Sequence, residues 1–457
     1  MRRLLLPALT ILAALAAPAA AHASSRQVTT FEAPRELLSA ATRDATLSKI
    51  TSLGVTNIRQ LVYWRDYAPD PSSAHKPAFD AGNPDAYPAG TWGNLDALIA
   101  DAKAHGVSVM LTLTGPPPRW AAKDSKLSYP DAKEFGAFAT AIGKHYGTSV
   151  DTWSIWNEPN QPQFLLPQYV HGKPASPLIY RKLYQAAYAG LRTSNPNDAI
   201  LIGETSPRGN EHVVHPLTFM RGMLCLTSSY RKSKSCGELQ ASGYAHHAYT
   251  TAAGPRFKPP SKDDVTIGVL SRLITALDKA GKAGALPKGL PIHLTEFGIQ
   301  SAPDKISGVS LSKQATYLAI AEHIAYVNPR VVQFSQYLLT DDSPRTSGYK
   351  YGGFESGLIS STGKEKPAYQ GFRLPLAAEE YGASDVLWGL VRPLRARSTV
   401  TILHKLNGKN WTELKTFDTT DSGVYALKAK HVSGQLYRVR WTAPDGSTYT
   451  GPPIRAY

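Results

Sequence analysis

The sequence has few of the residues and motifs that redox, metal or nucleotide chemistry needs. Only two cysteines occur among 457 residues, Cys225 and Cys236, and they flank a polar, basic loop without CxxC spacing. There is no HExxH motif, and no GxGxxG follows the first predicted strand, which argues against a zinc hydrolase and a dinucleotide-binding fold. We therefore expect no metal and no cofactor, and we predict a structural disulfide between Cys225 and Cys236.

Long apolar runs are absent after the N-terminus. Residues 1–23 begin with the basic sequence MRR, continue with an apolar run and end in AHA, which fits signal-peptidase cleavage after Ala23. Two prolines interrupt the run, and it is shorter than the ~20 residues that span a bilayer, so a membrane anchor is the less favoured interpretation. We expect a secreted protein with no stable membrane insertion.

Acidic residues are fewer than basic ones. Removing residues 1–23 takes two arginines from the 50 lysines and arginines and leaves the 35 acids, for a net charge of +13. The basic residues are scattered, without a stripe of interleaved aromatics, so we expect no nucleic-acid partner. This charge suits a protein near an anionic polysaccharide or a cell envelope, and it would equally serve solubility.

Short apolar runs alternate with longer amphipathic segments from about residue 28 to 372. The predicted strands lie at 27–32, 55–64, 107–115, 150–157, 199–205, 242–249, 291–298 and 331–339, and helical patterns between them include 94–106, 134–147, 179–195 and 269–281. Strands that alternate with helices predict a parallel sheet with right-handed crossovers. Eight such units favour an α/β fold of the closed (β/α)8 type, a TIM barrel, over an open doubly wound sheet.

The pattern changes after about residue 380. Short alternating segments separated by Gly, Asp and Ser turns predict a small C-terminal antiparallel β-sandwich. We place the barrel at 24–376 and the sandwich at 380–457, with the linker inside the stretch FRLPLAAEEYGASD.

Polar and aromatic residues cluster at the carboxyl ends of the predicted strands, the face that carries the active site of a TIM barrel. Aromatic faces stack on sugar rings while polar groups bind hydroxyls, so this mixture predicts a carbohydrate site. We expect the protein to be a monomer. The polar residues are Arg59, Asn157, Glu158, Glu204, His247, Tyr249 and Glu296, and the aromatic ones are Trp64, Trp120, Trp156 and Tyr337.

Two carboxyl groups, one protonated and one ionised, cleave glycosidic bonds, and a separation of about 5–5.5 Å gives retention of configuration. Glu158, in the motif WNEP, is expected to be partly desolvated, which raises its pKa and makes it the acid. Glu296 is then the nucleophile, with its charge held by Arg59 and Tyr249. Asn157 is expected to hydrogen-bond the sugar 2-hydroxyl.

The motifs WNEP on the fourth strand, HxY on the sixth and TEFG on the seventh together resemble glycoside hydrolase clan A. The segments TLTGPPPRW and WSIWNEPN are most similar to its family 39 and family 5 members, including secreted actinobacterial ones. The resemblance implies an O-glycosyl hydrolase that acts on a plant or bacterial wall glycan by double displacement. It implies Glu158 as acid/base, Glu296 as nucleophile, His247 and Tyr249 as residues that tune the nucleophile, and Arg59 beneath it. The C-terminal sandwich resembles immunoglobulin-like accessory domains of secreted bacterial hydrolases.

The sequence departs from the clan at the eighth strand. Many members carry a tryptophan there, whereas this chain reads QFSQYLL, so Tyr337 or Phe334 is expected to lie under the sugar. The identity of the sugar stays open, with xylose, glucose, galactose, mannose and uronic acids all compatible. A non-catalytic carbohydrate-binding or cell-envelope protein on the same barrel is the alternative function.

Strand alternation separates neighbouring candidates. His246 and His247 point to opposite faces, so one metal ion cannot easily bind both, and His246 is assigned a structural role. Trp153 is assigned to the core and Trp156 to the cleft, because Trp156 shares strand parity with Glu158. Glu204 has only its position in its favour, and a structural ion pair is preferred over a substrate contact.

Overall fold

The computed structural model describes residues 27–232, 236–406 and 408–457. The predicted signal peptide, residues 1–23, lies outside these described residues. Within them, no helix combines the length and the apolar character that crossing a bilayer requires.

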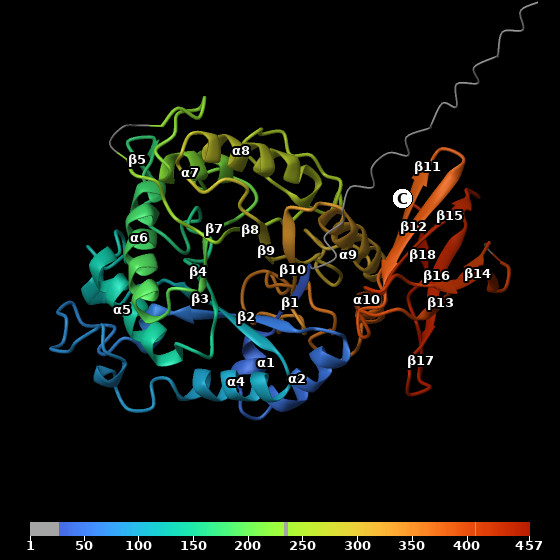
Figure 1. Ribbon diagram of the computed structural model, residues 1–457, viewed down its shortest axis with the longest axis horizontal. Helices are drawn as coiled ribbons and strands as arrows, with labels where there is room; N and C mark the ends of the chain where they lie inside the picture. The colour runs from blue at the N-terminus through green and yellow to red at the C-terminus, as the bar shows by residue number, and fades with distance from the viewer. Residues whose placement is uncertain (1–26, 233–235, 407) are drawn as a thin grey trace, which may run out of the picture.

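Eight parallel strands of the described chain close into a barrel in the order β1-β10-β9-β8-β7-β4-β3-β2, and helices surround it (Figure 1). The strands are β1 (Val28–Glu32), β2 (Asn57–Tyr63), β3 (Ser108–Thr114), β4 (Thr152–Ile155), β7 (Ala199–Thr205), β8 (Gly243–His247), β9 (Ile292–Glu296) and β10 (Val331–Tyr337). Each lies within a run predicted from the sequence, so the TIM-barrel prediction is confirmed. Both faces of a parallel barrel are covered, and β3 accordingly is buried at every residue after the first.

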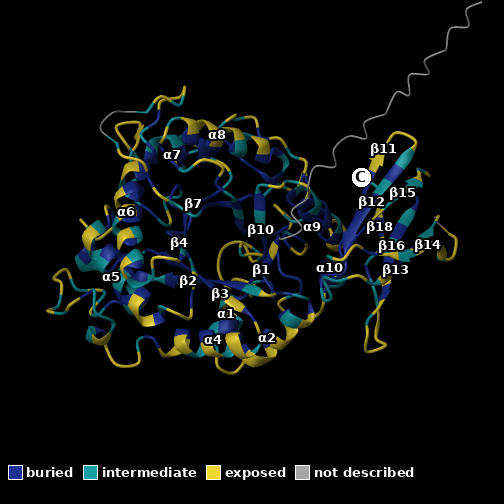
Figure 2. Ribbon diagram, in the orientation of Figure 1, coloured by how far each residue is buried: buried dark blue, intermediate teal, exposed yellow. Residues whose placement is uncertain are grey.

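The helices present their inner faces to the barrel and their outer faces to solvent (Figure 2). A side-chain cap marks the start of α5: the Asp131 carboxylate accepts hydrogen bonds from the backbone N–H groups of Lys133 and Glu134. The α-helices are α1 (Pro34–Leu38), α2 (Arg43–Ser52), α3 (Trp64–Tyr67), α4 (Gly93–Ala104), α5 (Ala132–Tyr146), α6 (Ser176–Ser194), α7 (Pro216–Met223), α8 (Leu270–Lys282), α9 (Leu311–Tyr326) and α10 (Pro367–Arg373).

Several smaller elements lie in the loops between the barrel strands and helices. They are the 3-10 helices at Pro84–Ala86, Arg119–Ala121 and Ile267–Val269, and the short hairpin of β5 (Tyr169–Val170) and β6 (Lys173–Pro174). A disulfide joins Cys225, just after α7, to Cys236, as predicted.

The C-terminal part forms two antiparallel sheets, which confirms the predicted sandwich. One sheet has the order β11-β12-β15, and the other has the order β14-β13-β16-β17 with β18 beside β16. The strands are β11 (Leu376–Tyr381), β12 (Ser384–Leu390), β13 (Thr399–Lys405), β14 (Thr412–Asp418), β15 (Val424–Lys430), β16 (Leu436–Thr442), β17 (Thr448–Thr450) and β18 (Ile454–Arg455). The stretch expected as a linker therefore contains β11, whose first four residues are buried and which begins three residues after the end of α10.

The two domains share a buried contact beside α9, where Figure 1 places the C-terminal sheets. Ile320 and Tyr326 of α9 pack with Trp388 and Leu390 of β12. Arg392, 1 % exposed, follows β12 and reaches into the barrel domain. Its guanidinium donates to Thr29 Oγ1 of β1 at 2.8 Å and to both oxygens of Glu322 on α9 at 2.6 and 2.8 Å.

Candidate active site

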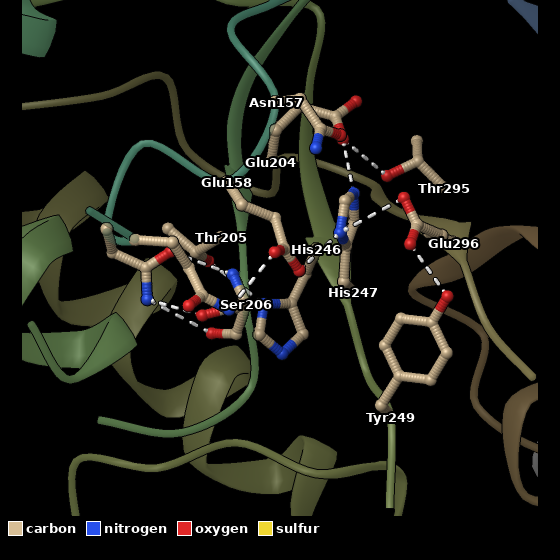
Figure 3. Close-up of polar contacts among 12 residues, drawn as sticks. Asn157, Glu158, Glu204, Thr205, Ser206, His246, His247, Tyr249, Thr295 and Glu296 are labelled. Atoms are coloured by element: carbon tan, nitrogen blue, oxygen red, sulfur yellow. Dashed lines mark hydrogen bonds and ion pairs between the residues drawn. The ribbon is translucent and has the colours of Figure 1, made fainter. Parts of the chain in front are cut away.

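The two glutamates predicted to be catalytic lie together at the carboxyl end of the barrel (Figure 3). Glu158 follows β4 and Glu296 ends β9, and both line a cavity of about 260 Å³. Nδ1 of His247 lies 3.0 Å from Oε1 of Glu158 and 3.5 Å from Oε2 of Glu296. These two oxygens are therefore no farther apart than the sum of the two distances, 6.5 Å. In inverting glycosidases the two carboxyl groups are about 6.5–9.5 Å apart. The upper limit for the two oxygens in this protein is therefore no larger than the smallest separation in that range.

Arg59 of β2 is the central cation beneath these residues. Its side chain is fully buried, and its guanidinium donates to oxygens from four different strand ends. Nη1 donates to Oε2 of Glu32 at 3.0 Å and to Oε2 of Glu296 at 3.1 Å, and Nη2 donates to Oδ1 of Asn157 at 2.7 Å and to Oε2 of Glu204 at 2.9 Å. The planar fork of donors thus fixes the directions of several side chains at once.

His247, at the end of β8, links three carboxyl groups. Besides its Nδ1 contacts, Nε2 lies 2.6 Å from Oε2 of Glu204. Burial alone would lower the pKa of His247, but the charge of Glu296 and hydrogen bonds with Glu158 and Glu204 raise that pKa to about 10. The imidazole is therefore protonated at neutral pH, and both ring nitrogens donate hydrogen bonds.

Glu204 forms structural ion pairs with Arg59 and His247, the role that the sequence analysis preferred over a substrate contact. The backbone places it by a bulge: Gly203 has φ +115°, Glu204 has φ +50°, and the pairing of β7 with β8 shifts between Gly203 and Thr205. The side chain is fully buried, outside the cavity lining, and Oε2 also accepts from Thr295 Oγ1 at 3.0 Å. Burial opposes ionisation, but Arg59 and His247 outweigh it and lower the pKa of Glu204 to about 2.

Glu158 and Glu32 have the opposite electrostatic character. Burial raises the pKa of Glu158 above its usual range, against the hydrogen bond and charge of His247. Burial also raises the pKa of Glu32, on β1, to about 8 despite the nearby Arg59. Both carboxyl groups thus favour the protonated form. The sequence analysis missed Glu32, whose one available signal is its position at the end of the first predicted strand.

Tyr249 and Asn157 complete the polar lining, and both were predicted. Burial and the charge of Glu296 raise the pKa of Tyr249 well above its usual value, so its hydroxyl stays protonated and donates to Oε1 of Glu296 at 2.7 Å. Asn157 accepts from Arg59 through Oδ1, and its backbone N–H donates to Thr114 Oγ1 at 3.0 Å. With Oδ1 engaged, the Asn157 amide group presents its N–H donors to a ligand in the cavity.

His246 has the structural role expected for it. It is fully buried, with Nδ1 3.0 Å from Thr205 Oγ1 and Nε2 2.8 Å from the carbonyl oxygen of Val265. Burial lowers its pKa to about 4, so the ring is neutral.

The predicted positions of three tryptophans are wrong. Trp64 is 1 % exposed in the core, and Trp156 is fully buried. Trp120 packs edge-on against Trp64 and lines no part of the catalytic cavity. The parity argument failed for Trp156 because β4 ends at Ile155 and Trp156 has φ +65°, which turns its ring away from the cavity. That ring rests on Gly115, where a Cβ would lie 2.4 Å from it.

Other aromatic residues line the cavity instead. Tyr337, one of the two residues expected under the sugar, lines the cavity, while Phe334 is buried against Phe297. The lining residues that the sequence analysis missed are Leu61, Tyr63, Gln161, Gln163, Phe164, Pro207 and Phe354. Most of them lie in loops, where the sequence has no periodic pattern. Tyr63 directly precedes Trp64, and the sequence analysis assigned the cavity-facing position to Trp64 instead.

Comparison with known proteins agrees with this geometry. Residues 19–329 match the model of a family described as cellulase (glycosyl hydrolase family 5). A family 39 glycoside hydrolase from the gut symbiont Bacteroides cellulosilyticus WH2 is similar in structure, with a TM-score of 0.51 and 16 % identity over 89 % of this chain and 82 % of that one. A glucosidase from Croceicoccus marinus has a TM-score of 0.53 and 11 % identity over 91 % and 95 %. At these identities the two structures show a shared fold alone. The comparison with curated proteins gave no match.

Proposed function

The chain belongs to the cellulase family, glycosyl hydrolase family 5, and we propose that it is a secreted enzyme that hydrolyses a wall oligo- or polysaccharide by double displacement. The observation that carries the proposal is the convergence of Glu158 and Glu296 on one cavity, with His247 in contact with both. The disulfide between Cys225 and Cys236 supports export to an oxidising compartment.

In the first step, a carboxylate oxygen of Glu296 attacks the anomeric carbon while the bond to the leaving oxygen breaks. Glu158 gives its proton to that oxygen, and burial, which raises its pKa, favours the protonated form that this step needs. Arg59 and Tyr249 hold the attacking carboxylate in position through their hydrogen bonds to its two oxygens.

In the second step, Glu158 acts as the base. Its carboxylate takes a proton from water, the water oxygen bonds to the anomeric carbon, and Glu296 leaves as the free carboxylate. The protonated His247 beside Oε1 of Glu158 stabilises the ionised form that exists between the two steps. The Asn157 amide is placed to donate to the 2-hydroxyl, a contact that strengthens in the transition state.

A panel of aryl β-glycosides with good and poor leaving groups, made for each candidate sugar, tests this proposal. Glu158→Gln should lower kcat/KM for poor leaving groups by about 10²–10⁴-fold while good leaving groups still load the enzyme. Glu296→Gln should abolish turnover of both. Glu211→Gln is the matched control, because Glu211 is exposed on the loop after β7.

A 2-fluoro-sugar that traps the covalent intermediate identifies the nucleophile by peptide mass spectrometry. The label should be on Glu296. A label on another residue would overturn that assignment, and an equal background rate in wild type and both variants would refute hydrolysis altogether.

A further inference from the structure

A second cavity adjoins the catalytic one. Its volume is about 280 Å³, against about 260 Å³ for the catalytic cavity, and Tyr249 and Phe354 line both. The two cavities thus share two aromatic lining residues. Neighbouring cavities of nearly equal volume suit two successive units of one glycan chain.

Two residues of the second cavity's lining, Gln300 and Ser356, carry polar atoms that lack hydrogen-bond partners among the described residues. Nε2 of Gln300 donates to the carbonyl oxygen of Gly353 at 3.1 Å and to Asp304 Oδ2 at 3.3 Å, which fixes the amide. Its Oε1 is buried and accepts no hydrogen bond from the described residues, and the hydroxyl of Ser356, a residue 1 % exposed, is likewise without a partner among them. Both atoms are closed to solvent, so they lie behind the cavity wall and are not available to a ligand in the cavity.

A single charged side chain lines the cavity, and it is a cation. Arg208 follows β7 and is exposed, and it forms no ion pair or hydrogen bond with any other described residue. No carboxylate lines this space. A guanidinium whose N–H groups are not otherwise engaged can donate two parallel hydrogen bonds to the two oxygens of a carboxylate.

Exposed apolar side chains border the same cavity. Phe354 is 41 % exposed and Ile306 is 74 % exposed, and both belong to the lining. Exposed apolar side chains in a cavity wall suit the C–H face of a pyranose ring.

We propose that this second cavity is a sugar subsite that binds a uronic acid unit adjoining the unit hydrolysed in the catalytic cavity. Arg208 pairs with the uronate carboxylate, and Phe354 covers the apolar face of the sugar ring. The inference rests on the proposed function, since it names the substrate class of the same active site: a glycan that carries carboxylates.

The test compares each acidic glycan with itself after reduction of its carboxylates to primary alcohols. Glucuronoxylan, polygalacturonate, alginate and hyaluronan are paired with their carboxyl-reduced forms, and affinities are measured in the Glu296→Gln background, in which no turnover is expected. At least one acidic glycan should bind roughly tenfold more tightly than its reduced form, the size of one charge-assisted hydrogen bond. This ratio should fall to about one in Arg208→Gln and stay partly intact in Arg208→Lys.

Lys430→Gln is the matched control, because it removes the same charge from an exposed position on β15 of the C-terminal domain. It should leave the ratio unchanged. A preference for carboxylates that survives Arg208→Gln, or that Lys430→Gln removes equally, would assign the effect to the overall positive charge and overturn the subsite. The absence of any preference would overturn it as well.

Failure of the subsite and failure of the proposed function give different results. Hydrolysis of aryl β-glycosides without a carboxylate preference overturns the subsite alone. Arg208-dependent binding without hydrolysis of any substrate supports the subsite and refutes the enzyme.

Discussion

Glu204→Gln removes a carboxylate that is fully buried between Arg59 and His247. The pKa of Glu204 lies at about 2, against a usual value of 4.5. At 1.36 kcal/mol per pKa unit, this difference corresponds to on the order of 3 kcal/mol of stability. Loss of one partner from a buried pair costs about 3–5 kcal/mol, which agrees. We therefore expect the variant to lose about 3 kcal/mol of unfolding free energy at pH 7.

The pH dependence gives the sign of the effect. A group whose pKa is lower in the folded protein than in the unfolded chain stabilises the fold at pH values above its unfolded-state pKa. This stabilisation is lost as the pH falls through its folded-state pKa. The contribution of Glu204 is thus complete above pH 4.5 and disappears between pH 4.5 and about 2. The difference in stability between wild type and Glu204→Gln should shrink over the same window.

Urea unfolding followed by tryptophan fluorescence measures this difference, because five of the eight tryptophans lie in the barrel. Glu211→Gln is the control: the Glu211 side chain is 80 % exposed, and its replacement should change stability by less than about 0.5 kcal/mol. If Glu204→Gln were as stable as wild type at pH 7, the claim that Glu204 is an ionised partner of both cations would be refuted.

Three further predictions follow from other features. Gly115→Ala places a Cβ 2.4 Å from the ring of Trp156 and should cost about 1–3 kcal/mol in thermal unfolding and lower kcat, because the ring supports the backbone just before Glu158; an unchanged Tm would contradict this. The double variant Cys225→Ser, Cys236→Ser opens a loop with a sequence separation of 11 and should lose about 3 kcal/mol, and reduction of the wild type should produce the same loss. Since Glu158 must be protonated to act as the acid and its pKa is raised, kcat/KM for poor leaving groups should fall as pH rises through that pKa; the same alkaline decline with activated substrates in Glu158→Gln would exclude Glu158 as its cause.

The barrel and its strand-end residues were predictable from the sequence because buried parallel strands are continuous apolar runs. Polar residues at the ends of such runs, such as Glu158 and Glu296, then have few structural explanations. The chemistry-bearing residues are therefore visible as interruptions in an apolar pattern.

The direction of a side chain beyond a strand end was not predictable in the same way. Alternation holds only while the backbone is extended, and the positive φ of Trp156 breaks it one residue past β4. The raised pKa of Glu32 depends on burial among residues from other strands, which no local pattern records. Loop residues such as Phe354 reach the cavity through folding over long sequence distances, and periodicity contains no information on that placement.

The guanidinium of Arg392 has a consequence for how the chain can be divided. A fragment that ends before the C-terminal domain would keep Glu322 on α9 without the cation that neutralises it, and would expose Ile320 and Tyr326 of the same helix to water. The barrel domain is therefore not expected to fold normally when it is expressed without the C-terminal domain or fused to other partners in its place. We therefore expect the C-terminal domain to contribute to the stability and the solubility of the barrel through this contact.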